Sequence, residues 1–147
     1  MRSLAHRLCG DEGSAAIEAA IVLPSLLLFL CLAIAGGRIV TSGSKIDSAA
    51  QDAAREASIH RTAAAAQGAA RSAAAESLND QGIKCTSTAV RVDTGGLSVP
   101  VGQVGTVTVT VTCTVSLSDL LLPGLPGAKT LTSTTTSVVD RYRQRGV

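Results

Sequence analysis

The residues most able to do chemistry in this chain stand at the start of an apolar stretch. Gly13 precedes Glu18 by five positions, and Glu18 lies near the beginning of an apolar run of about 19 residues, from Ile17 to Ala35. A run of that length crosses the core of a bilayer as a helix. A charge inside such a segment costs roughly 2.5–3.5 kcal/mol at its centre and less toward an end. We therefore expect Glu18 to have a function.

The spacing resembles the processing site of type IV pilins and pseudopilins, where a peptidase cuts after glycine and leaves glutamate at the fifth mature position. Gly13-Ser-Ala-Ala-Ile-Glu18, followed by Ile21-Val-Leu-Pro24 and a leucine run, resembles more closely the TadE-like family of the tight-adherence pilus apparatus. The resemblance covers roughly residues 11–60. It implies that a prepilin-type peptidase cuts between Gly13 and Ser14. Pro24 predicts a kink in the helix.

Three other interpretations of the apolar run remain open. In a cleavable signal peptide, the chain would be cut after Ala33-Ile-Ala35, although the run is longer than usual for such a peptide and acids stand at its start. A lipoprotein would use Cys31, but Phe29-Leu30 lacks the small residue needed before that cysteine. In a plain membrane anchor, Glu18 would only lie at the interface.

The charges beside the apolar run predict its orientation. Arg2, His6 and Arg7 precede it, so the N-terminus is expected to stay in the cytoplasm by the positive-inside tendency. Arg38 and Lys45 follow it, which weakens the asymmetry. We predict a single-pass protein of a bacterial cell membrane, with its C-terminal part outside the cytoplasm.

The cysteines agree with this topology. Cleavage would remove Cys9, and Cys31 lies in the apolar run, which leaves Cys85 and Cys113 in the distal part. A lone pair of cysteines in an oxidising compartment favours one disulfide. Closing such a loop stabilises a domain by about 3–4 kcal/mol on the chain-entropy model. The alternative is two buried free thiols.

Alanine spaced at helical intervals dominates the part after the apolar run. From Thr41 to about His60, the spacing of three and four predicts that the membrane helix continues past Gly36-Gly37. Thr62 is the expected cap of a second helix that runs to about Asn79 and stops before Gly82. These alanine faces either pack against sister subunits or belong to a solvated spacer. The stripe consists of Ile46, Ala49, Ala50, Ala53, Ala54 and Ala57.

From Ile83 onward the period changes to two, which predicts strands. The segment from Thr106 to Leu117 alternates valine or cysteine with threonine or serine, so one face is buried and the other is wet. Further strands are expected at Ile83–Asp93 and Leu131–Asp140, the latter after the turn cluster 122–127. The fold class is α+β: a long N-terminal transmembrane helix that continues into Ala-rich helices, then a small three-stranded antiparallel sheet with one disulfide. The Ala-rich helices are expected to lie against the apolar face of the sheet.

Little in the sequence points to catalysis. His60 has no recognisable serine and acid partners, and we interpret it as a solvated helix residue. No cluster has metal-ligand spacing, and no glycine-rich segment matches a phosphate loop. With 13 Lys plus Arg against 11 Asp plus Glu, the charge balance gives no argument for nucleic-acid binding. We expect no enzyme activity, cofactor, metal or small-molecule substrate.

The resemblance and the pattern together divide the chain into five parts. These are a leader (1–13), a transmembrane helix (14–37), an Ala-rich helical region (38–82), a small extracytoplasmic β domain (83–141) and a basic tail (142–147). The family implies a pseudopilin-like subunit of a pilus assembly or secretion apparatus, with the peptidase, other pilus subunits and membrane lipid as partners. The alternative is a membrane-anchored exported domain of binding or scaffold type, with no role in a pilus.

Overall fold

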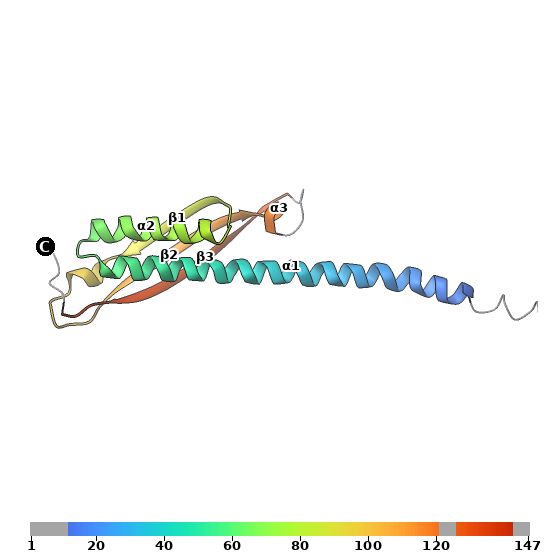
Figure 1. Cartoon of the computed structure of the whole chain (residues 1–147), viewed down its shortest axis with the longest axis horizontal. Coiled ribbons are helices and arrows are strands. Elements are labelled where there is room, and N and C mark those ends of the chain that lie inside the picture. The colour runs from blue at the N-terminus through green and yellow to red at the C-terminus, as the bar shows by residue number, and fades with distance from the viewer. Residues whose placement is uncertain (1–11, 121–125, 143–147) are drawn as a thin grey trace, which may run out of the picture. The chain divides into compact units, whose positions relative to one another are not determined.

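The computed structural model describes residues 12–120 and 126–142, with side chains from residue 16 onward and without that of Leu120. The described chain divides into two compact units, Met1–Gly37 and Arg38–Val147. Unit 1 consists of the first part of helix α1, and unit 2 holds the rest of α1 and every later element (Figure 1). The α+β class predicted from the sequence is confirmed.

Helix α1 runs without interruption from Glu12 to Ile59. It continues through Gly36-Gly37, as the sequence predicts, and serine hydroxyls beyond that point bond back to the helix: Ser42 Oγ donates to the Arg38 carbonyl at 2.9 Å. Such back-bonding leaves the serines without unsatisfied donors. In unit 2, α1 turns one face inward, and the predicted stripe from Ile46 to Ala57 is buried there.

Helix α2 (Ala63–Asp80) has both of its predicted ends. Thr62 Oγ1 accepts a hydrogen bond from the Ala65 amide at 3.3 Å, which satisfies one of the free donors of the first turn. At the other end, the amide of Ile83 donates to the Leu78 carbonyl at 3.0 Å and that of Gly82 to the Asn79 carbonyl at 2.9 Å. This is a Schellman motif, and it requires the left-handed backbone of Gly82, whose φ is +68°.

The sheet contains three antiparallel strands in the order β1-β2-β3 among the described residues. They are β1 (Cys85–Asp93), β2 (Gly105–Ser116) and β3 (Ala128–Val139). A short 3-10 helix, η1 (Gly95–Ser98), joins the first two strands, and the helical turn α3 (Leu117–Leu120) follows β2. Leu117, which the alternation assigns to the inner face of the strand, instead begins α3, because the chain turns away from the sheet there.

The alternation in β2 gives the sheet one dry and one wet face, as predicted. Val107, Val109, Val111 and Cys113 are fully buried on the inner face. On the outer face, four threonines of β2 pair with four of β3 through hydroxyl contacts of 2.9–3.3 Å, for example Thr110 with Thr134. Paired hydroxyls across two strands stabilise the register without burial.

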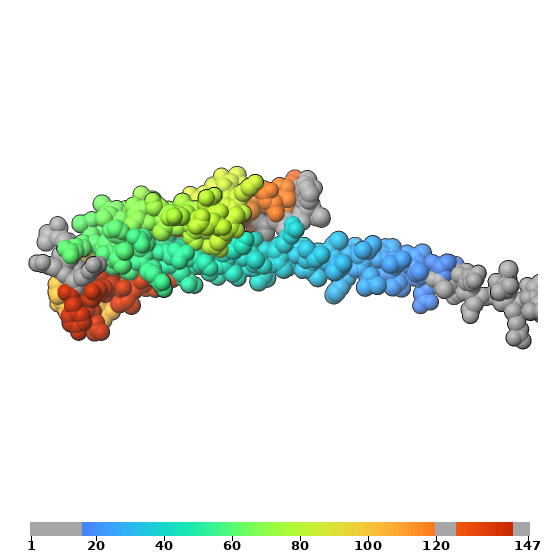
Figure 2. All heavy atoms as spheres, viewed as in Figure 1, coloured from blue at the N-terminus to red at the C-terminus, as the bar shows by residue number. Residues whose placement is uncertain are grey.

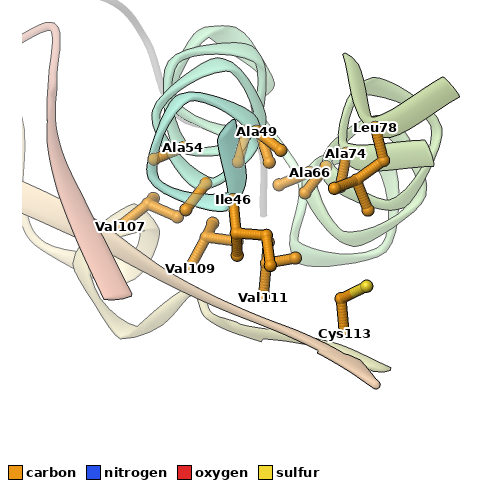
Figure 3. Close-up of a cluster of buried hydrophobic side chains, with 14 of the residues drawn as sticks. Ile46, Ala49, Ala54, Ala66, Ala74, Leu78, Val107, Val109, Val111 and Cys113 are labelled. Carbon is orange, nitrogen blue, oxygen red and sulfur yellow. The ribbon is translucent and has the colours of Figure 1, made fainter. Parts of the chain in front are cut away.

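The core of unit 2 lies between the two helices and the inner face of the sheet (Figure 3). Alanines of both helices line it, and Ala49, Ala54, Ala66 and Ala74 have no exposed surface. Figure 2 shows the atoms of α2 lying directly against those of α1. The predicted packing of the Ala-rich helices against the apolar face of the sheet is confirmed, whereas neither a subunit interface nor a solvated spacer describes the buried alanines. They are the internal core of this chain, because small side chains let α2 approach α1 closely while both helices cover the valines.

A disulfide joins β1 to β2. Cys85 and Cys113 are bonded with a Cα–Cα distance of 5.5 Å, across a separation of 28 residues, which confirms the predicted pairing. In the register, Cys113 lies opposite Thr88 and Cys85 lies opposite Val115, so the bridge crosses the strand pair diagonally. It closes the chain at the end of the sheet where β1 begins, and Cys113 belongs to the core (Figure 3).

Candidate functional site

The part of α1 in unit 1 is apolar around its whole circumference. Its large side chains are exposed, Leu28 and Phe29 at 70% each, and no other element of the described chain covers them. One helix among the described residues is long and apolar enough to cross a membrane, within Ala16–Ile59. A soluble protein rarely leaves so large an apolar surface uncovered. This helix is consistent with a single-pass membrane anchor.

Glu18 is the one acidic or basic residue of the described chain between Ala16 and Gly37. It lies in α1, one helical turn beyond Ser14, and its side chain is exposed. Residues four apart share a helix face and lie about 6 Å apart along the axis. Gly13 and Ser14 are part of the helical backbone, but the side chain of Ser14 lies outside the described residues, as does the leader up to residue 11. Processing at Gly13 thus stays a prediction.

Pro24 lies inside α1 without ending it. A proline in a helix has no amide to donate, so the carbonyl four residues earlier loses its helical partner. The neighbouring Ser25 hydroxyl contacts two carbonyls of the preceding turn, those of Val22 at 2.8 Å and Ile21 at 3.2 Å. Neither is the carbonyl of Ala20, which is the one that Pro24 leaves without its helical amide partner. A kink at this position stays a prediction.

His60 differs from our interpretation of it as a solvated helix residue. It follows the last residue of α1, and its Nε2 atom lies 3.5 Å from the carboxylate of Glu56. That atom is buried and has no hydrogen-bond partner among the described residues. Elsewhere in unit 2, Ser137 Oγ donates a hydrogen bond to Ser58 Oγ at 3.1 Å.

Acidic side chains line an open groove between α1 and α2. Asp52 accepts a hydrogen bond from Ser77 Oγ at 2.8 Å, and Glu56, Glu76 and Asp80 lie along the same groove with Arg55. In the described part of the chain, no three histidine, cysteine or acidic residues are grouped closely enough to hold a metal ion. The basic tail from residue 143 lies outside the described residues.

These features define the class of the protein: an apolar helix consistent with a membrane anchor, followed by a small disulfide-bonded α+β unit. Residues 13–55 match the family model described as TadE-like protein, so the chain contains a TadE-like domain in that segment. The domain occupies nearly all of α1 and includes Gly13, Glu18 and Pro24. No curated protein and no solved structure matches the chain significantly. The TadE-like family is structural and pilus-related, not enzymatic.

Proposed function

We propose that this chain is a pseudopilin-like subunit of a tight-adherence pilus assembly or secretion apparatus. The observation that carries the proposal is the position of the TadE-like domain, which coincides with α1 and contains Gly13 and Glu18 at the spacing of a pilin processing site. The exposed apolar surface of unit 1 supports an anchor in the membrane from which such a subunit is assembled. The N-terminus then lies in the cytoplasm and unit 2 outside it.

Cleavage after Gly13 would place two charges one helical turn apart. The new α-amine of Ser14 is largely protonated at neutral pH, and Glu18 is the acid nearest to it on the same helix face. In a medium of low dielectric constant, unlike charges attract strongly and an unpaired charge is costly. We propose that Glu18 of one subunit pairs with the Ser14 amine of a neighbour and so sets the axial register of stacked helices.

The mature N-terminus tests the processing step. Mass spectrometry of protein from a host that has the apparatus is expected to find a chain that begins at Ser14. A bulky substitution, Gly13→Val, is expected to abolish cutting, whereas Gly13→Ala keeps part of it. A chain that begins at Gly36 would show signal-peptide cleavage and would refute the proposal.

Glu18→Ala tests the pairing. Because the pair matters only between subunits, the variant is expected to insert and to be cut normally but to co-purify poorly with other subunits. Asp47→Ala is the matched control, since Asp47 is an exposed acid of the same helix in unit 2. If Glu18→Ala co-purifies as well as the control, Glu18 is only an interfacial residue.

The second candidate is an anchored exported domain without a pilus role. It is favoured by one observation: α2 and the whole sheet lie outside the matched segment 13–55. The gene neighbourhood separates the two candidates. Adjacent genes for a secretion ATPase and integral-membrane assembly proteins favour the pilus subunit, and their absence favours the exported domain.

A further inference from the structure

Strand β3 forms one edge of the sheet and is long for an edge strand. It runs for 12 residues, from Ala128 to Val139, whereas strands in globular proteins usually have about five or six. It pairs with β2 on one side, and among the described residues no further strand lies on its other side. Its outer edge therefore offers a long row of backbone amides and carbonyls to a partner strand.

The side chains of β3 are mostly polar on both faces of the sheet. Its outer face carries the threonines that pair with those of β2. Its inner face carries Ser133, Thr135 and Ser137 opposite the buried valines of β2. A strand that is polar on both faces gains little from burial and accepts further pairings readily. The backbone edge, more than the side chains, is thus what β3 offers to a partner.

Neither outer strand has a proline or a central bulge to protect its edge. Proteins use such features, and charged side chains, to keep exposed edges from pairing. β3 has no register shift against β2, and its one charged residue, Lys129, stands at its start. In β1 the register shifts only between Cys85 and Ser87, and from Ser87 to Asp93 the pairing with β2 is regular. Both edges thus contain a regular stretch that a further strand can join.

The directions of the two outer strands determine how copies of unit 2 can join. β1 and β3 run in the same direction, because each is antiparallel to β2. Two copies in the same orientation therefore place β3 of one beside β1 of the next as a parallel pair. Pairing of β3 with β3 would be antiparallel and would need copies of opposite orientation. Subunits of one assembly share an orientation, which favours β1 of a second copy as the partner of β3.

The register of the sheet shows which residues would meet across the new pair. Ala89 of β1 and Thr132 of β3 both lie opposite Thr112 of β2, so they stand at the same level of the sheet. Arg91 and Thr134 likewise share one partner in β2. All four side chains are exposed on the outer face. A copy displaced sideways by one sheet thus brings its Ala89 beside Thr132 and its Arg91 beside Thr134, without opposing like charges.

We infer that β3 of one copy of this chain pairs in parallel with β1 of a second copy, so that their sheets join into one. The inference rests on the proposed function, since that function gives neighbouring copies the same orientation. The interface is heterologous, because each copy uses β3 toward one neighbour and β1 toward the other, and it can continue along a row of copies. Backbone hydrogen bonds supply the affinity, and the alternating side chains set the register.

Cysteine cross-linking between two differently tagged copies of the full chain tests the pairing. The copies are expressed together in a host that has the apparatus, and both carry Cys9→Ala and Cys31→Ala, which removes the other free thiols. One copy carries Thr132→Cys and the other Ala89→Cys. A mild oxidant is expected to link the two tags, and mass spectrometry of the linked peptides identifies the bridge. Ser72→Cys, exposed on α2, replaces Ala89→Cys as the matched control and should not link.

The outcomes separate the pairing from its alternatives. Thr132→Cys copies that link to one another as readily as to Ala89→Cys copies would show antiparallel pairing of two β3 strands and overturn the inference. Equal links to Ala89→Cys and to Ser72→Cys would show random collision and overturn it too. No link between the two tags also overturns the pairing, whereas the mature N-terminus, read from the same sample, decides the proposed function separately. Retention of the Cys85–Cys113 disulfide confirms that each variant folds.

A charge at Thr134 tests the register of the pair. Thr134→Lys, added to the Thr132→Cys copy, is expected to lower the yield of the cross-link about two- to five-fold, because like charges opposite one another destabilise a strand pair. Thr134→Asp loses the same hydroxyl contact with Thr110 but faces Arg91 of the second copy with the opposite charge, so it should not lower the yield. Arg91→Glu in the second copy is expected to restore the yield of Thr134→Lys. Equal yields from the lysine and aspartate variants would overturn the proposed register.

Discussion

The two parts of α1 have the same secondary structure and opposite surroundings. Before Gly37, the large leucine and phenylalanine side chains of the helix are exposed. After Arg38, it buries a narrow stripe of alanine and isoleucine and turns charged residues outward. The first part is consistent with a membrane anchor, while the second is covered by α2 and the sheet. We therefore expect that a change in one part leaves the other intact.

Loss of the disulfide is expected to have the largest effect, and only on unit 2. Reduction, or Cys85→Ser with Cys113→Ser, lowers the free energy of unfolding by about 3–4 kcal/mol, because the unfolded chain gains the freedom of an open loop. Hydrogen exchange of peptides from β1 and β2 in the full-length chain measures the loss. Membrane extraction of the same variant serves as the control and should not change. Quantitative thiol labelling of both cysteines in native, unreduced protein would refute the disulfide.

A charge in the middle of the apolar part is expected to impair membrane insertion and to leave the fold of unit 2 unchanged. Leu27→Arg costs roughly 2.5–3.5 kcal/mol of insertion free energy, because the guanidinium has no partner there. Gln51→Arg, on the exposed side of α1 in unit 2, is the matched control and should insert normally. Alkaline extraction of membranes separates inserted from peripheral chains. If both variants insert equally, the apolar part does not span the membrane.

The same substitution, alanine to leucine, can be made in both parts of α1: Ala49→Leu in unit 2 and Ala33→Leu in the apolar part. Ala49 faces Ala66 of α2 in the core (Figure 3), so three extra carbons push the helices apart and destabilise unit 2 by about 1–3 kcal/mol. Ala33→Leu adds the same carbons to the apolar part, where Ala33 is exposed, and is expected to cost nothing. Hydrogen exchange of α2 peptides distinguishes them. An unchanged Ala49→Leu protein would show that the two helices are not closely packed.

The sequence predicted those elements whose pattern has one physical cause. Threonine alternating with valine can satisfy only a half-buried strand, and β2 has that structure. Thr62 and Gly82 predicted the ends of α2 because capping and left-handed geometry restrict the residue type. The disulfide was predicted because only two cysteines remain in the distal part of the chain and because that part was expected to lie in an oxidising compartment. Each of these signals is local or leaves few alternatives.

The sequence predicted that the Ala-rich helices pack on the apolar face of the sheet, but it did not identify α2 as a further partner of the alanine stripe in α1. A row of alanines serves equally well on a spacer, at a subunit interface or in a core, and the choice depends on α2 folding back along α1. The sequence predicted a strand at Leu131–Asp140, whereas β3 runs from Ala128 to Val139. Pairing of Ser116 with Ala128 extends the strand at its start, and the residues Ala128-Lys-Thr contain no pattern that predicts this pairing. Gly13 and Glu18 came from the family pattern, and their roles depend on partners outside this chain.

Loss of the N-terminal cap of α2 is expected to have the smallest effect, and it tests whether α2 is needed to cover the buried face of α1. Thr62 Oγ1 accepts from the Ala65 amide, and Thr62→Ala leaves that amide without a partner, which costs about 1 kcal/mol. The alanines of α1 are buried only when α2 forms and folds back along α1. Amide hydrogen exchange should therefore become faster on both sides of this helix contact, in α2 and in residues 46–57 of α1. Thr62→Ser keeps the acceptor and should restore protection. Faster exchange in α2 alone would show that the sheet, without α2, is enough to hold α1.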